Sequence, residues 1–441
     1  MRRNSGLLIW LFLIALTVSS CNRENSIHPG KLPAVSDTLI VSLLESSLEQ
    51  EEYFKLDRQY DLYKDQLSAR DYMYFGGMVD NIFSDYSSSL QKLDRLEKKY
   101  GKRLSPLHSM HLHKALRMNY YHTYNYAGAY KETVILTSEY ADMIDSVELS
   151  ELLDDQRLLK AIRFAPPQVI TLPGDISIPF KRDNWDSMLL KVDFGVFISD
   201  FLFDTGFSMS CMRRSLAEQT GLPIYDVDLP VAGATGEKAL CDVIVVDSFY
   251  LGELLIRNSI FWVFDDKDLS LPEYDFYVNG VIGMPILQAL GELKIYRDGK
   301  IFIPGQPGEY HLRNLAFTDL DPVIAVVENN DTMPFYFDTG ASFSEFYHTY
   351  YEKNKERIEK QFERKTYRFG SLAGVKEFHY FLADSSTINV GGSSAELYNK
   401  GIHMESVYDD PEKVYGNLGS DFIKLFDAMT ISFTSNSVFF E

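Results

Sequence analysis

The sequence FLFDTG at residues 201–206 recurs as FYFDTG at residues 335–340. Each copy places one aspartate, Asp204 or Asp338, between an apolar run that is typical of a strand and a Thr-Gly pair. A repeated unit with one aspartate per copy can bring two carboxylates together on a pseudo-twofold axis. Two adjacent carboxylates that share a proton can activate a water molecule.

The repeat extends beyond the two aspartates. A hydrophobic segment follows each copy at nearly the same interval and ends in Gly283 in the first copy and Gly419 in the second. Helix-like segments are expected at 209–220 and 344–364, and paired terminal strands close each copy. Each copy also contains a hairpin with glycines near its tip, and these flap candidates are Gly233, Gly236, Gly370 and Gly374. The pattern predicts two homologous β lobes, at residues 168–307 and 308–441.

Residues 37–165 have a different pattern, in which apolar residues recur at three- and four-residue steps. Gly101 is a helix stop, and Ser105-Pro106 predicts the start of the next helix with a serine cap. We expect a domain of helical hairpins that weakly resembles tetratricopeptide-type repeats and could receive a partner protein. Its cluster of tyrosines fits a packed core or a peptide-binding groove: Tyr120, Tyr121, Tyr124, Tyr126 and Tyr130. Pro166-Pro167 marks the boundary with the β-rich part.

The first 20 residues read as a signal peptide, with Arg2-Arg3 before a short apolar run and small residues before Cys21. This pattern resembles a bacterial lipobox, which implies that Cys21 is lipidated and that residues 21–36 form a tether. The alternative is an ordinary signal peptide with an incidental cysteine. We expect an exported bacterial lipoprotein, anchored in the outer membrane and facing the periplasm or the cell surface. Asn22 in place of Asp argues against retention in the inner membrane.

Net charge and cysteine content limit which classes of partner and ligand the protein is expected to bind. The 441-residue chain has a net charge of −20, which argues against a nucleic-acid partner. Cys211 and Cys241 could form a disulfide in an exported protein, or they could be buried free thiols. No Cys or Cys/His group has zinc-site spacing, so no metal is expected.

Because of the doubled motif and the matched glycines, residues 168–441 resemble a two-lobed aspartic protease of the pepsin/retropepsin superfamily. Among its members, the sequence is most similar to bacterial retropepsin-like proteins. The resemblance implies a multidomain chain, with an N-terminal all-α helical-hairpin domain followed by an all-β bilobal aspartic-protease fold. It also implies a role for each motif position. Asp204 and Asp338 are the expected catalytic aspartates, and the hydroxyls of Thr205 and Thr339 are expected to hold the two loops together. Gly206 and Gly340 are expected where the backbone approaches the carboxylates, and Gly283 and Gly419 in the strands beneath the loops.

Two positions depart from the family pattern. Phe207 stands where a small residue usually follows Asp-Thr-Gly, and Asn417 interrupts the hydrophobic pair before Gly419. Ser208, and Ser342 in the second loop, are the hydroxyls expected to give further support to the aspartates. These departures put catalytic activity in question more than the fold.

The resemblance implies an envelope-tethered aspartic endopeptidase that hydrolyses peptides or proteins with two carboxylates and a water, without a cofactor. Both aspartates lie on one chain, so catalysis needs no dimer. The alternative is a catalytically inactive lipoprotein that binds peptides or partner proteins, which Phe207 favours and the two retained Asp-Thr-Gly triplets oppose. A third possibility, compatible with the first, is that the helical domain delivers a partner protein to the lobes.

Overall fold

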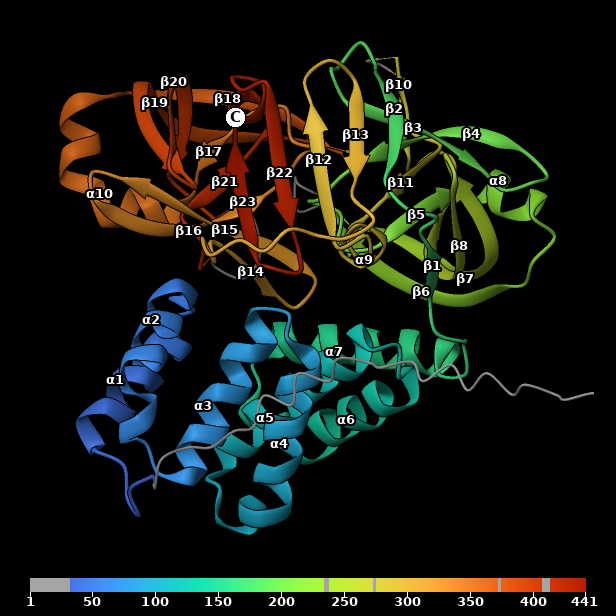
Figure 1. The fold of residues 1–441 in the computed structure, drawn as a ribbon. Coiled ribbons are helices and arrows are strands. Elements are labelled where there is room, and N and C mark those ends of the chain that lie inside the picture. The colour runs from blue at the N-terminus through green and yellow to red at the C-terminus, as the bar shows by residue number, and fades with distance from the viewer. Residues whose placement is uncertain (1–31, 234–237, 273–274, 372–373, 407–412) are drawn as a thin grey trace, which may run out of the picture.

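The computed structural model describes residues 32–233, 238–272, 275–371, 374–406 and 413–441. The predicted signal peptide, Cys21, most of the tether and Gly236 lie outside these ranges. A layer of helices lies beneath two β lobes that sit side by side (Figure 1). Within the described ranges, no helix combines the length and the apolar character that a membrane crossing requires.

The N-terminal region consists of antiparallel helix pairs. Its helices are α1 (Thr38–Glu49), α2 (Tyr53–Tyr63), α3 (Ala69–Ile82), α4 (Tyr86–Tyr100), α5 (Pro106–His122), α6 (Tyr126–Glu139) and α7 (Ser146–Ile162), with short 3-10 turns at Lys64–Gln66, Gly101–Arg103 and Ala141–Met143. Ser105 caps α5 as predicted, since its hydroxyl accepts the His108 N–H at 3.1 Å.

The turns within the first three helix pairs share one design. A single non-glycine residue with positive φ ends the first helix, and these residues are Glu51, Ser84 and Tyr124. The second helix of each pair then begins two residues later with a tyrosine: Tyr53, Tyr86 or Tyr126. This recurrence explains why the sequence weakly resembles a helical-hairpin repeat.

The first lobe contains β1 (Val169–Thr171), β2 (Ile176–Arg182), β3 (Met188–Asp193), β4 (Ile198–Phe203), β5 (Ser210–Arg213), α8 (Arg214–Gln219), β6 (Ile224–Ala232), β7 (Lys238–Leu251), β8 (Leu254–Phe264), β9 (Ser270–Leu271), β10 (Phe276–Tyr277), β11 (Gly280–Ile282), α9 (Met284–Ala289), β12 (Glu292–Tyr296) and β13 (Lys300–Ile303). The second contains β14 (Leu315–Thr318), β15 (Asp321–Glu328), β16 (Asp331–Phe337), β17 (Glu345–Phe346), α10 (His348–Gln361), β18 (Glu363–Ser371), β19 (Gly374–Val390), β20 (Ser393–His403), β21 (Gly416–Leu418), α11 (Ser420–Ile423), β22 (Ala428–Ser432) and β23 (Ser437–Phe440).

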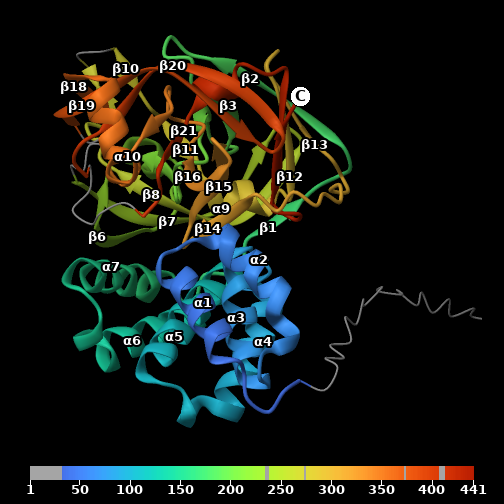
Figure 2. The ribbon, with the colours of Figure 1, turned by 90° about the vertical axis from the view of Figure 1, so that its left-hand side faces the viewer.

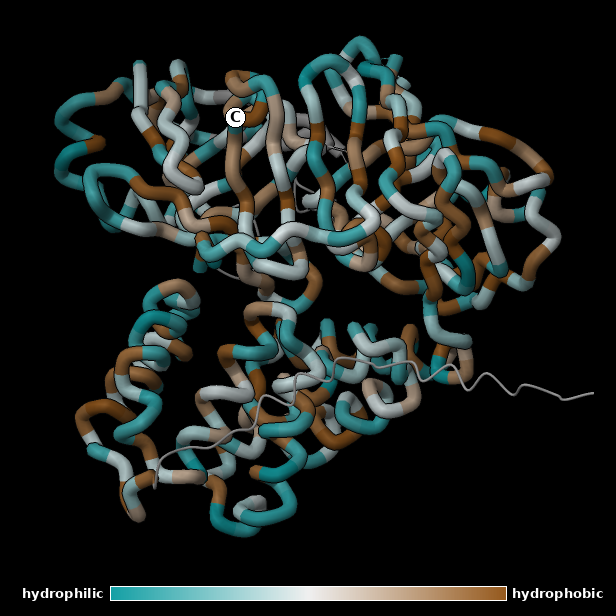
Figure 3. Tube along the Cα trace, in the orientation of Figure 1, coloured by the Kyte–Doolittle hydropathy of each residue, from teal (hydrophilic) through white to brown (hydrophobic). Residues whose placement is uncertain are grey.

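The two lobes have the same strand order. Lobe 1 runs β3-β4-β11-β5-β8-β7-β6, and lobe 2 runs β15-β16-β21-β17-β20-β19-β18. The terminal strands join them, because β12 of lobe 1 pairs antiparallel with β22 of lobe 2. One hydrophobic core runs through both lobes, and hydrophobic stretches follow the strands of each (Figure 3). The doubled sequence therefore folds into two copies of one topology.

The expectation of helices directly after both aspartate turns was partly wrong. The segment 209–220 begins with strand β5, and only its second half is the short helix α8. Likewise, β17 precedes α10 in the second copy. Strand β5 lies between β8 and β11 and pairs with both, so tertiary pairing overrides the local pattern.

Cys211 and Cys241 are buried free thiols. They lie on strands on opposite sides of β8, where Cys211 is opposite Trp262 and Cys241 is opposite Phe264. Two interstrand spacings of about 4.8 Å each therefore separate them laterally, beyond the reach of about 7 Å for the Cα atoms of a disulfide.

The helical layer packs against both lobes (Figure 2). Helices α1 to α5 share a hydrophobic cluster with lobe 2 that includes Ala316 and Val323, whereas α5 to α7 share one with lobe 1 that includes Met209. Tyr121 and Tyr126 belong to this second cluster, in keeping with a packed core. Together with Tyr124 they also line a cavity of about 480 Å³ between the helices and the lobes.

Candidate active site

Both aspartates sit where a strand leaves the sheet beside a parallel neighbour. Strand β4 leads into Asp204 and runs parallel to β11, and the Asp204 N–H donates to the Ile282 carbonyl at 3.2 Å. Strand β16 leads into Asp338 in the same way, and the Asp338 N–H donates to the Leu418 carbonyl at 3.1 Å. Each turn is thus tied to the segment that ends in the downstream glycine.

The two carboxyl groups face each other across the boundary between the lobes. A Cβ atom on Gly206 would lie 2.3 Å from Asp338 Cγ, and one on Gly340 would lie 2.2 Å from Asp204 Oδ2. The Gly340 N–H donates to Asp204 Oδ1 at 3.1 Å. Only glycine permits this approach, since any other residue at either position would overlap the opposite carboxylate.

The two threonines bind the turns to each other. The Thr205 N–H donates to Thr339 Oγ1 and the Thr339 N–H donates to Thr205 Oγ1, both at 3.0 Å. Thr205 Oγ1 donates in turn to the Phe337 carbonyl at 2.7 Å. Both threonines are buried, so water does not compete for these bonds.

The downstream glycines lie beneath the turns. A Cβ atom on Gly283 would lie 2.5 Å from the Phe207 and Met209 carbonyl oxygens, and one on Gly419 would lie 2.7 Å from the Phe343 carbonyl. The Gly283 N–H donates to Ser210 Oγ at 3.0 Å, and the Gly419 N–H donates to Ser344 Oγ at 2.9 Å.

Sequence reasoning missed this pair of buried serines. Ser210 and Ser344 stand at the same position in both copies of the repeat, counted from the aspartate. That repetition was the signal that could have identified them.

The electrostatics of the pair are unequal. Burial, and then the charge of Asp338, raise the pKa of Asp204 far above its usual range. Burial also raises the pKa of Asp338. Backbone hydrogen bonds to the charged forms oppose the rise at both groups: the Gly340 and Ala341 N–H groups each donate to Asp338 Oδ1 at 2.8 Å, and the Gly206 and Gly340 N–H groups donate to Asp204 Oδ1 at 2.8 and 3.1 Å. The two carboxyl groups also hydrogen-bond each other. At intermediate pH the pair therefore holds one proton, which the two carboxyl groups share.

Asn417 contributes to this asymmetry. Its side chain hydrogen-bonds Asp338 and lowers the pKa of that carboxyl, whereas the equivalent residue in lobe 1 is the apolar Val281. The departure from the family pattern at Asn417 thus places a buried polar group beside one of the two aspartates.

Ser208 and Ser342 do not have the expected contacts with the aspartates. Ser208 Oγ donates to Asp321 Oδ1 at 2.5 Å, across the boundary between the lobes. Ser342 is exposed, and its carbonyl, not its hydroxyl, accepts the Ser420 hydroxyl at 3.5 Å. Asp321, which the sequence did not single out, is a third acid beside the pair, and burial raises its pKa to about 6.

Phe207 fits without displacing either aspartate. Its ring packs edge-on against Trp262 with centroids 6.1 Å apart, and its carbonyl accepts the Met284 N–H at 3.0 Å. Ala341 takes the equivalent place in lobe 2, where its carbonyl accepts the Ser420 N–H at 2.9 Å.

The flap candidates lie on two hairpins. Gly233 directly follows β6 in the β6–β7 hairpin, while Gly236 lies outside the described residues. In the β18–β19 hairpin, Gly370 pairs with Val375 and Gly374 pairs with Ser371. Both hairpins are thus formed, at equivalent places in the two lobes.

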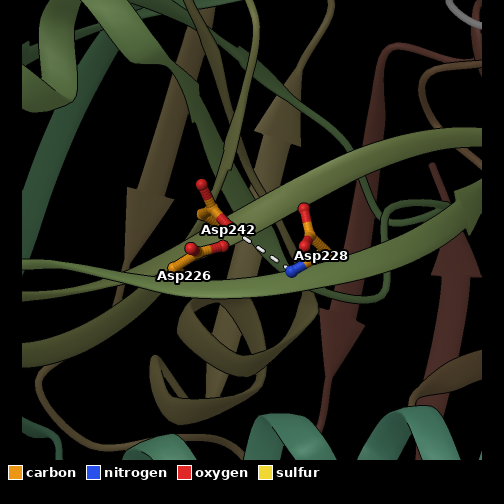
Figure 4. A group of neighbouring side chains, drawn as sticks. All are labelled: Asp226, Asp228 and Asp242. Carbon is orange, nitrogen blue, oxygen red and sulfur yellow. Dashed lines mark hydrogen bonds between the residues drawn. The ribbon is translucent and has the colours of Figure 1, made fainter.

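A cluster of three carboxylates on lobe 1, formed by Asp226, Asp228 and Asp242, has a structural explanation (Figure 4). Asp242 Oδ1 accepts the Val227 N–H at 3.0 Å and the Asp228 N–H at 3.4 Å. These bonds lie where the pairing of β6 with β7 changes register. Arg214 neutralises the other oxygen at 2.7 Å, so the cluster stabilises a β-bulge.

Replacing Thr339 by Val should destabilise the protein by about 1–3 kcal/mol, because the buried Thr205 N–H loses its acceptor. Urea unfolding followed by tryptophan fluorescence measures the change. Thr339→Ser retains the hydroxyl and should recover most of the loss; equal losses in the two variants would contradict the role of the hydroxyl.

Gly340→Ala should abolish any activity of the pair, because the added Cβ overlaps the Asp204 carboxylate. Gly101→Ala is the matched control, since a Cβ there meets only a side-chain carbon at 3.7 Å. Peptide hydrolysis, with circular dichroism to verify folding, measures both. Full activity in Gly340→Ala would show that the two loops are not held this close.

Asn417→Val installs the residue of the opposite lobe and removes a hydrogen bond that favours charged Asp338. The pKa of Asp338 should rise, so the acidic limb of the pH profile of kcat/KM should move to higher pH. Val281→Ala, a change beside the other aspartate that removes no hydrogen bond, is the control. An unchanged acidic limb in Asn417→Val would exclude Asn417 as the source of the asymmetry.

Comparison with known proteins identifies the β-rich part. A family model described as aspartyl protease matches residues 190–286, which include Asp204 and Gly283. No curated protein matches the chain. Among similar solved structures is basic 7S globulin from soybean, with 11% sequence identity and a TM-score of 0.36; the match covers 61% of this chain and 95% of that chain. Conglutin gamma from lupine seeds has 10% identity and a TM-score of 0.37, and the match covers 60% of this chain and 94% of that chain. A retropepsin-like aspartic protease from Rickettsia conorii is also similar, with 18% identity and a TM-score of 0.22; the match covers 31% of this chain and 92% of that chain. The chain therefore consists of an N-terminal helical region followed by a β-rich, two-lobed fold of the aspartic protease type.

Proposed function

We propose that the protein is an aspartic endopeptidase that hydrolyses peptide bonds with Asp204, Asp338 and a water molecule. The observation that carries the proposal is the close approach of the two carboxyl groups, each of which lies against the glycine of the opposite loop. A buried pair of this kind holds one proton and one negative charge, and hydrolysis of an amide requires both an acid and a base.

The inequality of the two environments supports distinct roles for the two aspartates. Each carboxyl group accepts two backbone N–H groups, but Asn417 adds a hydrogen bond that favours charged Asp338 where Asp204 has the apolar Val281 beside it. Asp338 is therefore assigned as the general base that takes a proton from the water. Asp204, whose pKa is raised by burial and by the charge of Asp338, is the acid that hydrogen-bonds the oxygen of the scissile carbonyl as negative charge develops there. The proton taken from water then passes to the leaving nitrogen, and the peptide bond breaks without a metal or an organic cofactor.

We extend the proposal to the location of the enzyme. The n-region, the apolar run and the small residues before Cys21 support an exported lipoprotein, tethered through Cys21 to the outer membrane with the catalytic lobes facing the periplasm or the cell surface. Both aspartates come from one chain, so the site is complete in a monomer. The helical region is proposed as the place where a partner protein could bind.

The packing of Phe207 argues against the alternative hypothesis that the protein is an inactive binding lipoprotein. Its ring rests on Trp262, and the loop around Asp204 keeps the same backbone contacts as the loop around Asp338. The bulky side chain is therefore accommodated at the base of lobe 1.

Asp204→Asn and Asp338→Asn should each lower kcat/KM by about 10²–10⁴-fold, because either change removes one member of the acid–base pair. The assay is peptide-library cleavage from acidic to neutral pH by the soluble form that begins after Cys21. Asp247→Asn, on an exposed part of β7, is the matched control and should retain activity.

Two results would refute the proposal. One is that the folded wild-type protein cleaves no peptide in the library. The other is that cleavage survives either substitution at the pair.

A further inference from the structure

We propose that the helical region closes one of the two sides from which a peptide chain can leave the aspartate pair, so that the enzyme cuts peptides near one end. This inference rests on the proposed hydrolysis of peptide bonds, and it narrows that function from internal bonds in general to bonds near one end of a chain. The two lobes have the same topology, so the residues beside the aspartate of one lobe can be compared with the equivalent residues of the other.

The two loops leave the pair in symmetry-related directions. In lobe 1 the chain continues through residues 207–209, and in lobe 2 it continues through residues 341–343. On this proposal, an extended peptide with its scissile bond at the pair follows the same pseudo-twofold axis, so it passes over one of these segments on the amino side of that bond and over the other on its carboxyl side. A free path on both sides is needed to cut the middle of a long chain.

On the lobe 1 side, helix α5 packs directly on the segment. The Tyr121 hydroxyl donates to Met209 Sδ at 2.9 Å, and Met209 is only 1% exposed. Tyr121, Tyr126 and Ala129 of the helical region form a hydrophobic cluster with Met209 and other residues of lobe 1. Helix α5 therefore covers Met209 of this segment, and the cavity of about 480 Å³ that Tyr121, Tyr126 and Met209 help to line lies beside the same contact.

A turn of lobe 2 completes the closure. Asp319, with a φ of 49°, lies in the turn between β14 and β15. Arg117 of α5 binds its carboxylate, with 3.2 Å between Nη2 and Oδ1, and His122 of α5 contacts its carbonyl at 3.3 Å. Directly after this turn, Asp321 accepts the Ser208 hydroxyl. Helix α5, the lobe 1 segment and the lobe 2 turn thus meet in one junction.

On the other side, the part of the chain that the structure describes leaves the counterpart residues exposed. Phe343, the counterpart of Met209, is 58% exposed, and Ser342, the counterpart of Ser208, is also exposed. The turn between β2 and β3, the counterpart of the β14–β15 turn, carries Trp185, which is 46% exposed. Figure 1 shows β14 facing the helices, and β2 at the far end of its lobe. Exposed aromatic side chains are typical anchors for a bound chain.

The geometry points to a defined class of substrate. A peptide can place only a short segment on the lobe 1 side, and a longer segment passes Phe343 and Trp185 on the other. Free peptides and the flexible ends of proteins satisfy this condition. An internal loop of a folded protein does not, because its chain has to continue in both directions.

A peptide ladder tests the inference with the soluble wild-type protein. One cleavable core is extended by single residues at its amino end in one series and at its carboxyl end in the other. We expect kcat/KM to fall by at least about tenfold beyond a limiting length in one series only, and to hold or rise in the other. Equal tolerance of both extensions, or equal cleavage throughout a long unfolded protein, would overturn the inference and leave the proposed function intact.

A binding experiment separates failure of the inference from failure of the proposed function. The same ladder is made with a non-hydrolysable hydroxyl-bearing isostere at the scissile position, and Kd is measured by calorimetry. If no peptide is cleaved, a loss of affinity in one series only still supports the closed side. Symmetric binding overturns the closed side, and a lack of binding by every isostere overturns both the inference and the proposed function.

A pair of variants identifies the open side. Phe343→Ala should lower kcat/KM by about fivefold for peptides extended on the tolerant end and leave the shortest peptide unchanged, because only extended chains reach this ring. Phe164→Ala removes a ring just after the end of α7 that is 82% exposed, more than Phe343, and should change neither. An equal effect of Phe343→Ala on short and extended peptides would contradict the assignment of the open side.

Discussion

The structure of the site depends on the reciprocal hydrogen bonds between Thr205 and Thr339. Each threonine donates its backbone N–H to the hydroxyl of the other at 3.0 Å, so each turn completes the other. Two turns held at this separation leave room for glycine alone between the carboxylates, which explains Gly206 and Gly340. The carboxyl groups are then close enough to share a proton, and their raised pKa values follow from this contact and from burial.

The site is built by duplication, but its chemistry depends on where the two copies differ. The backbone contacts of the two turns match, from the downstream glycines to the supporting serines. The side chains beneath them do not match, because Asn417 lies beside Asp338 where lobe 1 has Val281. A symmetric pair has no preferred base, whereas unequal hydrogen bonding gives the charge a preferred position.

The helical region adds a second asymmetry on a larger scale. It contacts both lobes, and its helix α5 binds Asp319 and Met209, which are close in sequence to the bonded pair Ser208 and Asp321. The tyrosines that the sequence left open between a core and a groove serve mainly as packing, since Tyr121 and Tyr126 are buried against lobe 1. Attaching an extra region to a two-lobed fold can therefore change access to the site without changing the site itself.

Much of the fold and of the site could be predicted from the sequence, because two copies of one motif indicate two copies of one structure. The doubled Asp-Thr-Gly and the matched glycines predicted two lobes of one topology, and the cap at Ser105 predicted the start of α5. Local signals failed where a contact from the opposite lobe or a neighbouring strand decided the outcome. Strand β5 was mistaken for the beginning of a helix, and Ser208 was assigned to the aspartate pair although it bonds Asp321.

The sequence by itself determined which residues could form the pair and that one chain supplies both, since motif identity and spacing are local properties. Only the tertiary structure decided that the two carboxyl groups meet, that Asn417 lies beside Asp338, and that Asp321 lies near them. Each of these depends on atoms far apart in the chain, whose distances follow from packing between lobes and not from any local pattern.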